Sequence, residues 1–410
     1  MSLANEASLL LIPSGYKSGK VYSVFPTDGD GDFTFTRGSD GTRVGAGGLV
    51  ETMSSNIPRL DYLNSDCPSL LLQPQRTNLN TYSESSTGKT TQNLTLTDNN
   101  ETSPNGEFNA VKITDDTVNF RHRFWANNVS VTSGTQYTIS FYVKKNSPSR
   151  YIYLNAGILG TNGSFSLDNQ STTGSVQVFE SLDNDWYRIG LTGTAPTTTT
   201  SVYFIQMQLG TSDASYIGDG SSFYFWGLQM EQGSYPTSYI KTTSGTVTRQ
   251  KDFIDGAGSS SLFNSLESTF FVEMASFLNA QTGSNGIELA DISGQNRITL
   301  QYDTTNNQIR CDVRVLNSAQ AIITTQSFDV TNFNKMAITY KLNEVKFYVN
   351  GQLISTDTSV NLFAPNTLTE VRSTIAGISG GAFNLQAKIK DLRVYDRVLT
   401  QAEAIQLTTL

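Results

Sequence analysis

The chain has 410 residues, of which 37% are apolar and only 16% charged, and its formal net charge is −8. Disordered chains combine low hydrophobicity with high charge, which this composition lacks, so we expect a globular protein. An acidic chain without basic blocks also lacks the positive charge that binding to a phosphate backbone requires, so we expect no nucleic-acid partner. One histidine and two cysteines are too few for a cysteine-rich zinc site or a three-histidine metal site.

The first residues, MSLANEASLLLIPSGYKSGK, do not form a secretory signal. Glu6 stands where basic residues are expected, and Pro13 follows a short apolar run. No apolar run in the chain approaches the roughly 18 residues that a membrane-spanning helix needs, so we expect no membrane insertion.

An acidic loop, DGDGDF, follows. Asp28, Asp30 and Asp32 have the spacing of the first ligands in a Ca²⁺-binding loop, but Phe33 stands where that loop requires glycine and Ser39 where it requires glutamate. We favour a surface turn leading into the strand FTFTR and keep a weak Ca²⁺ site at the three aspartates as the alternative. No other cofactor is expected.

Two changes in composition divide the chain. The polar run SSTGKTTQNLTLTDNNETSPNGE follows the apolar stretch PSLLLQPQRTNLNTYSE, and a second polar stretch begins at YIKTTSGTVTRQ. We therefore predict an N-terminal segment at 1–80 and two modules at 81–248 and 249–410, each of ordinary domain size.

Short alternating segments predict an all-β fold with two antiparallel β-sandwich modules. YTISFYV, VYFIQMQL and IRCDVRV each place apolar residues on one face, which makes Cys311 a core residue. Cys67 and Cys311 lie far apart, and we expect both as reduced thiols. Asn350-Gly351, between two apolar runs, predicts a tight hairpin because both residues tolerate positive φ. His122, in NFRHRFWANN, is predicted to lie on a strand at a surface or interface.

The end of the chain predicts its one helix. In LTQAEAIQL, Thr400 is the expected N-cap and Glu403 completes a capping box. In the preceding strand, Ile389 falls out of the alternation of Leu392 and Val394, which indicates a β-bulge near Lys390-Asp391.

Residues 252–410 resemble concanavalin A-like (laminin G-like) jelly rolls in the segments VKFYVNGQLI and DLRVYDRVLTQAE. The middle module is similar to carbohydrate-binding β-sandwiches in YTISFYVKKNS, DWYRIGLTGTA and FYFWGLQMEQGSYPTSYI. The run DFTFTRGSDGTRVGAGGLVE, with PRLDY and CPSLLLQPQRTNL after it, resembles a segment of bacteriophage virion proteins. In tail-fibre, head-fibre and capsid-decoration proteins that segment precedes such modules.

A sugar site needs an aromatic surface for the apolar face of the ring and fixed polar groups for its hydroxyls. We predict that Trp186 and Trp226 are core residues, since large aromatic side chains are mostly buried. Trp125, which follows Arg121, His122 and Arg123, is the tryptophan that we expect to be exposed or interfacial, and Tyr151 and Tyr153 in the segment RYIYLN are further glycan-binding candidates.

Jelly-roll lectins bind at loop ends, so the resemblance makes Asp303, Asn306 and Asn307 in DTTNNQ candidates for glycan binding. An ordinary hairpin loop explains them equally well.

The fold that residues 252–410 resemble also occurs in glucanases, whose catalytic acids follow the pattern E-x-D-x-x-E on one strand. Glu267 with Glu273 and Glu288 with Asp291 do not match this pattern, so we expect no enzyme and no catalytic residues.

Together these residues predict a non-enzymatic phage virion protein with lectin-like sandwiches for attachment to host-surface glycans. The N-terminal segment is expected to bind other virion proteins, and phage fibres suggest a homotrimer. The protein would assemble in the host cytoplasm and be displayed on the particle. A capsid-decoration (cement) protein that binds no glycan is the alternative, and a glycan depolymerase is a third.

Overall fold

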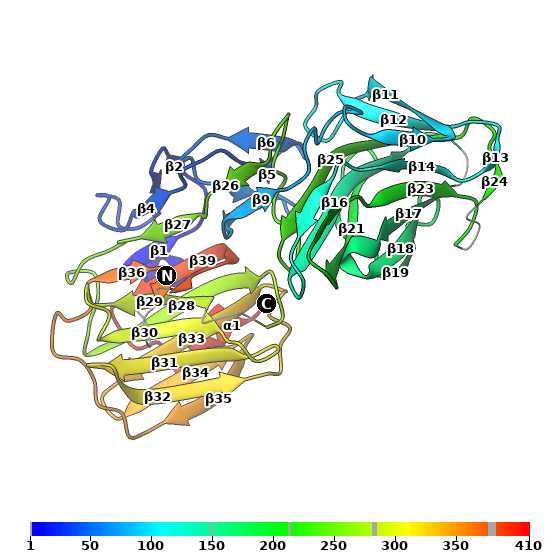
Figure 1. Cartoon of the computed structure of the whole chain (residues 1–410). Helices are drawn as coiled ribbons and strands as arrows, with labels where there is room; N and C mark the ends of the chain where they lie inside the picture. Colours follow the sequence, from blue (N-terminus) through cyan, green and yellow to red (C-terminus); the bar gives the residue numbers. More distant parts are fainter. Residues whose placement is uncertain (1, 148–149, 212–214, 281–284, 376–382) are drawn as a thin grey trace.

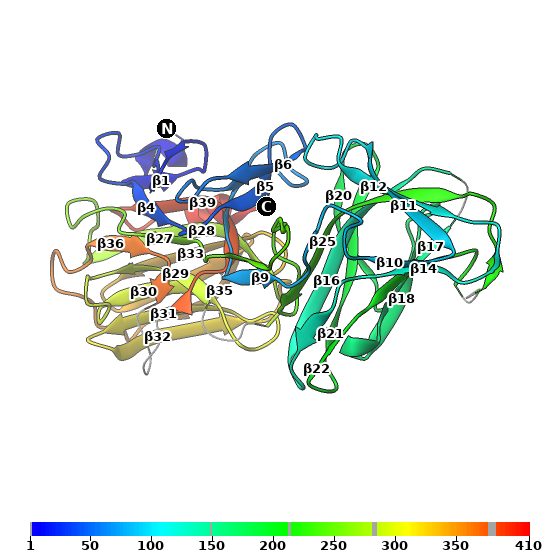
Figure 2. The ribbon, with the colours of Figure 1, turned by 45° about the horizontal axis from the view of Figure 1, so that its top comes forward.

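Nearly all regular structure is β-sheet in the computed structural model, which describes residues 2–147, 150–211, 215–280, 285–375 and 383–410. Two sandwich bodies lie side by side, and the N-terminal residues run over one of them and into the junction between the two (Figures 1 and 2). The predicted all-β fold is confirmed. A helix with the length and apolar character to cross a membrane is not found in the described residues.

The C-terminal body is a jelly roll of two facing sheets. In its larger sheet the strand order is β35 (Gln352–Asp357), β34 (Glu344–Val349), β33 (Asn334–Lys341), β28 (Glu267–Ser276), β39 (Ala387–Tyr395), β8 (Ser69–Leu72) and β7 (Leu60–Asp61), with β1 (Leu9–Leu11) also on β39. In the other sheet the order is β32 (Ser318–Thr325), β31 (Ile309–Val315), β30 (Arg297–Tyr302), β29 (Asn285–Ala290) and β36 (Glu370–Arg372). Their inward apolar residues form one core.

Strands from the N-terminal segment complete this jelly roll. β1 and β8 share one edge of β39, with Leu9 opposite Val394 and Leu70 opposite Ile389. Leu9 and Leu70 are fully buried in the same core as the residues of β39. The segment 1–80 therefore contributes strands to the same sheet as residues 249–410.

The middle body is a sandwich of two six-stranded sheets. One has the order β10 (Thr90–Gln92), β14 (His122–Trp125), β23 (Phe204–Gln208), β17 (Tyr151–Ala156), β18 (Thr161–Ser166) and β19 (Thr172–Gly174). The other has the order β11 (Leu94–Glu101), β12 (Ala110–Asp115), β25 (Ser222–Gln232), β16 (Gln136–Lys145), β21 (Trp186–Thr194) and β20 (Gln177–Leu182). The second sheet lies toward the jelly roll and the first lies away from it (Figures 1 and 2).

Short sheets and helices make up the rest. The strands are β2 (Tyr16–Lys17), β3 (Lys20–Val21), β4 (Phe33–Thr36) and β27 (Phe253–Asp255) in one sheet, and the pairs β5 (Gly41–Val44) with β6 (Val50–Met53), β9 (Arg76–Asn78) with β26 (Val247–Arg249), β13 (Asn119–Phe120) with β24 (Tyr216–Ile217), β15 (Val129–Val131) with β22 (Thr199–Ser201), and β37 (Thr374–Ile375) with β38 (Phe383–Asn384). The helices are η1 (Leu3–Glu6), η2 (Gly157–Leu159) and α1 (Gln401–Thr408). Through β4–β27 and β9–β26, the N-terminal segment pairs with the stretch that links the two bodies.

The local predictions at the C-terminal end are confirmed. Asn350 and Gly351 join β34 to β35 with φ of 48° and 78°, the positive values that a tight hairpin turn requires. Thr400 caps α1: its side-chain oxygen accepts a hydrogen bond from the backbone N–H of Glu403, and the Glu403 carboxylate accepts one from the backbone N–H of Thr400, which is the predicted capping box. Residue 390 is skipped in the pairing of β28 with β39, which is the predicted bulge. Cys311 is a buried core residue, and both it and the exposed Cys67 are free thiols.

A buried cluster of charged side chains joins the N-terminal segment to the linker between the bodies. The carboxylate of Asp252 accepts hydrogen bonds from the guanidinium groups of Arg37 and Arg59, and Arg249 lies 3.6 Å away. All four side chains are fully buried. Burial alone would raise the pKa of Asp252, but the charges of Arg59, Arg249 and Arg37 hold it below its usual value.

The carboxyl group of Asp255, at the end of β27, is poorly compensated. Its Oδ1 is buried without a hydrogen-bond partner among the described residues. Burial and the charge of Glu370 raise its pKa from 3.8 to about 6, although Arg372 opposes them. Between these two pH values the folded chain holds a proton that the unfolded chain has lost, so the free energy of unfolding falls as the pH rises through this range.

Replacing Asp255 with asparagine should therefore stabilise the protein at pH 7, by about 1 kcal/mol once partial solvent screening is allowed for. Urea unfolding at pH 4 and pH 7 would measure this, and the gain should shrink at pH 4, where the wild-type carboxyl is protonated in the fold. Asp66→Asn, at an exposed position, is the control. A variant less stable than wild type at pH 7 would contradict the prediction.

Candidate functional site

The outer face of the sheet that contains β14, β23 and β17 brings the predicted aromatic residues together. β23 lies between the other two strands, with Phe204 opposite both Trp125 and Asn155, and Gln206 opposite both Arg123 and Tyr153. Side chains alternate along each strand, so these residues share one face while their neighbours, such as Phe124, point into the core. This face is directed away from the jelly roll (Figure 2).

Four aromatic side chains on this face are half-buried: Trp125, Phe204, Tyr153 and Tyr151. The rings of Trp125 and Tyr153 lie 6.4 Å and 6.2 Å from the ring of Phe204, measured between centroids. The guanidinium carbon of Arg123 lies over two of these rings, 4.5 Å from the centroid of Trp125 and 4.9 Å from that of Phe204. We call Trp125, Phe204, Tyr153, Tyr151 and Arg123 the aromatic row.

Polar groups lie along the aromatic row. Arg123 donates a hydrogen bond from Nε to Oε1 of Gln92, and Nδ2 of Asn155 donates to the hydroxyl of Tyr153. Gln208, opposite Tyr151, is 4% exposed, and its Oε1 is buried with no hydrogen-bond partner among the described residues. Burial and the nearby charge of Arg121 lower the pKa of Arg123.

Such a face can bind a ligand that has both apolar and hydroxyl-bearing surfaces. Exposed ring faces contact apolar C–H groups, while amide and guanidinium groups donate and accept hydrogen bonds. The structure thus places Trp125, Tyr151 and Tyr153 on one surface. Phe204 was missed as a member, although the alternation of VYFIQMQL places it on the face opposite the core residues and could have identified it.

The other two tryptophans are core residues, as predicted. Trp186 and Trp226 are 2% and 1% exposed. Trp226 packs against Tyr239, with 4.4 Å between ring centroids, at the junction with the N-terminal segment.

His122 is buried, so its predicted surface or interface position is wrong. It lies on β14 as expected, but it shares the inward face of Phe124 rather than the outward face of Trp125. Its Nδ1 lies 2.6 Å from the carbonyl oxygen of Asn93, and its Nε2 lies 3.2 Å from that of Tyr216. The imidazole thus fills a polar gap in the core of the sandwich.

The acidic loop does not bring its carboxylates together. Asp28 accepts a hydrogen bond from the backbone of Asp30, Asp30 accepts one from Ser259, and Asp32 lies 3.4 Å from the ammonium group of Lys20. Among the described residues, no group of three or more His, Cys, Asp or Glu side chains could hold a metal ion.

The loop after β30 is held by its own contacts. Asp303 accepts hydrogen bonds from Arg310 and from the backbone of Thr304. Asn307 has a φ of 54°, and its side-chain oxygen accepts a hydrogen bond from Val330, while Asn306 is exposed. Of the three residues predicted here, Asn306 therefore has the most accessible side chain.

The acidic residues that were compared with the glucanase pattern have different surroundings in the fold. Glu288 is fully buried and accepts two hydrogen bonds from Arg372, each 3.1 Å long. Glu273 is half-buried on β28, and burial raises its pKa. Asp291 accepts hydrogen bonds from Asn296 and Ser293, which outweigh burial and lower its pKa.

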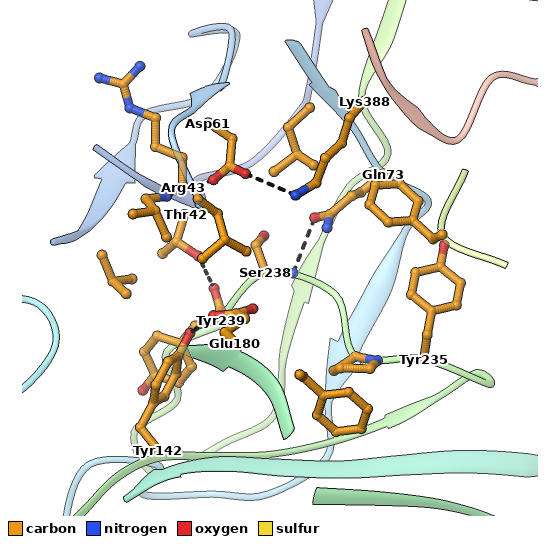
Figure 3. Close-up of a pocket in the computed structure, with 17 residues that line it drawn as sticks. Thr42, Arg43, Asp61, Gln73, Tyr142, Glu180, Tyr235, Ser238, Tyr239 and Lys388 are labelled. Carbon is orange, nitrogen blue, oxygen red and sulfur yellow. Dashed lines mark hydrogen bonds and ion pairs between the residues drawn. The ribbon is translucent and has the colours of Figure 1, made fainter. Parts of the chain in front are cut away.

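A concave site lies at the junction of the bodies, and the sequence analysis did not predict it. It is a cavity of about 220 Å³, lined by residues of the N-terminal segment, the middle sandwich and the jelly roll (Figure 3). Its polar side chains come from positions far apart in the chain, such as Asp61, Glu180 and Lys388, so no local motif indicates it.

Residues 269–405 match the concanavalin A-like lectin/glucanases superfamily, which confirms the predicted class of the C-terminal module. No curated protein matches the chain.

Solved structures with similarity to this chain include the CBM40 of the Ruminococcus gnavus IT-sialidase bound to α2,3-sialyllactose, at 14% identity, with a TM-score of 0.31 and coverage of 38% of this chain and 93% of that one. Domain 4 of a GH43 arabinanase from Geobacillus stearothermophilus, in complex with arabinotriose, is 14% identical, with a TM-score of 0.30 over 43% of this chain and 84% of that one. A pentraxin from Limulus polyphemus is 15% identical, with a TM-score of 0.30 over 36% and 71%.

Proposed function

We propose that this chain is a non-enzymatic virion protein of a bacteriophage that attaches to host-surface glycans through the outer face of its middle sandwich. The observation that carries the proposal is the aromatic row, in which Trp125, Phe204 and Tyr153 lie side by side and half-exposed. The concanavalin A-like domain at 269–405 is consistent with a lectin-like protein.

The phage assignment is supported only by the sequence, because residues 32–84 resemble a segment of bacteriophage virion proteins. The non-enzymatic assignment is supported by Glu288. This carboxylate is fully buried and accepts two hydrogen bonds from Arg372, so it is not exposed as a catalytic acid would be. As a homotrimer on the particle surface, the protein would present several weak sites at once and so gain avidity.

The N-terminal segment carries exposed apolar side chains. Its strands in the jelly-roll sheet are buried, but Ile12, Tyr22 and Val24 are 40%, 36% and 37% exposed. We propose that this surface contacts another virion protein. Antibody-labelled electron microscopy of the particle tests this placement, and a protein absent from purified virions would overturn it.

Trp125→Ala is expected to weaken binding to host polysaccharide by about tenfold or more, because aromatic residues at the centre of a contact dominate its energy. Tyr153→Ala should act in the same direction, and both variants should melt at the wild-type temperature since neither side chain is buried in the core. Isothermal titration with purified host polysaccharide provides the measurement.

Phe108→Ala is the matched control, because Phe108 is 62% exposed in the hairpin between β11 and β12, on the other sheet. Wild-type protein that binds the capsid but no host polysaccharide would indicate the cement function instead. Release of reducing ends from the polysaccharide would show a depolymerase and overturn the non-enzymatic assignment.

A further inference from the structure

The cavity at the junction has the features of a binding site separate from the aromatic row. Thr42, Asp61 and Gln73 line it from the N-terminal segment, Tyr142 and Glu180 from the middle sandwich, and Lys388 from the jelly roll. Figure 3 shows Asp61, Lys388 and Gln73 on one side of the cavity, and Tyr142, Tyr239 and Glu180 on the other. The cavity is partly open to solvent.

The side-chain amide of Gln73 has an N–H donor without an acceptor among the described residues. Its Oε1 accepts hydrogen bonds from Arg59, Arg249 and the backbone N–H of Ser238, all of which can only donate, so the orientation of the amide is determined. Its Nε2 must therefore point elsewhere, and no described residue accepts a hydrogen bond from it. Gln73 is 5% exposed and lines the cavity, so this unused donor is available to a molecule bound there.

Lys388 provides a second donor. Among the described residues its Nζ pairs only with Oδ2 of Asp61, at 3.3 Å, while Oδ1 of Asp61 accepts a hydrogen bond from the backbone of Val44. An ammonium group has three N–H bonds, so Lys388 can serve a ligand without breaking the ion pair.

The remaining lining selects a neutral molecule with an apolar face. The charges of Arg43 and Lys388 balance those of Asp61 and Glu180. Tyr235 and Phe277 form a stacked aromatic pair across the two bodies, with centroids 5.3 Å apart and planes at 10°. The cavity volume of about 220 Å³ is smaller than the ~300–1,000 Å³ of pockets that bind drug-sized ligands. We therefore expect a ligand no larger than one sugar ring.

We propose that the cavity binds a single neutral sugar ring of hexose size, whose hydroxyl oxygens accept hydrogen bonds from Gln73 and Lys388 and whose C–H face packs on the aromatic lining. This site does not depend on the aromatic row. A ligand here touches both bodies and the N-terminal segment, so its binding would also stabilise their junction.

Gln73→Glu is the sharpest test. Glutamate has the same shape and still accepts the three N–H groups, and its charge offsets the excess of arginine around Asp252, so the fold should be kept. It replaces the free donor with an acceptor. We expect D-glucose, D-galactose, D-mannose or N-acetyl-D-glucosamine, at millimolar concentration, to bind the full chain in saturation-transfer NMR, and Gln73→Glu to weaken that binding about tenfold.

Gln75→Glu is the matched control, since Gln75 is exposed and lies outside the cavity. Lys388→Met removes the second donor without touching the arginine cluster and should weaken binding as well. Binding should persist in Trp125→Ala, which separates this site from the aromatic row. The proposal is overturned if none of the four sugars binds, or if both Gln73→Glu and Lys388→Met bind as the wild type does.

Discussion

Replacing Asp252 with alanine is expected to lower the free energy of unfolding by about 3–5 kcal/mol, because it leaves buried charges without their partner. Arg37, Arg59 and Arg249 surround this one carboxylate, and the side chains of all four residues are fully buried. Asp252 also accepts a hydrogen bond from the backbone N–H of Gln73. The substitution should therefore destabilise both the N-terminal segment and the linker.

Urea unfolding followed by tryptophan fluorescence would measure the effect, with Trp226 reporting from the junction. Asp396→Ala, at an exposed position, should change stability by less than about 0.5 kcal/mol. A loss below about 1 kcal/mol for Asp252→Ala would mean that the arginines find other partners or water, and the cluster would then not hold the junction together.

Deleting residues 1–12 is expected to destabilise the jelly roll by more than about 5 kcal/mol. The deletion removes β1, in which Leu9, Leu10 and Leu11 are 0%, 2% and 0% exposed. Loss of one buried leucine side chain costs about 2–5 kcal/mol, and the edge of β39 would lose its hydrogen-bonded neighbour as well.

Calorimetry of the deletion variant and of Ile12→Ala gives the comparison. Ile12 is 40% exposed, so its truncation should leave the melting temperature nearly unchanged. If the deletion variant melts at the wild-type temperature and loses only its incorporation into virions, these residues act as a detachable anchor and the prediction is wrong.

The features that the sequence predicted well depend on neighbours in the chain. Thr400 and Glu403 form a capping box within one helical turn, and Asn350-Gly351 form a hairpin within one dipeptide. The alternation in YTISFYV needed no knowledge of the partner strand to place its apolar face in a core. Such short-range rules determine element type and one buried face.

The junction could not be predicted because its residues meet only in the folded chain. Arg37 and Asp252 are 215 positions apart, and each is of a type that is usually exposed. The same holds for Gln73, whose free amide becomes visible only once its three donors are known. In sequence, these residues look like ordinary polar positions.

The aromatic row could be predicted in part from the sequence. The sequence indicates Trp125, Tyr151 and Tyr153 as aromatic residues in polar surroundings, but their proximity depends on β23 lying between β14 and β17. That strand order also explains why Arg123 reaches both Trp125 and Phe204. For His122 the strand was predicted correctly, but the inward direction of its side chain was not.

The pairing of β1 with β39 has a consequence for biosynthesis. Ser8 and Val394, which are hydrogen-bonded in the fold, are 386 positions apart. A ribosome releases β1 long before β39 exists, so the leucines of β1 lack this neighbouring strand until synthesis is almost complete. Contacts of such long range slow folding and leave apolar strands open to aggregation. Chains truncated near the C-terminus should accordingly accumulate as insoluble protein, even though the middle sandwich is already complete in them.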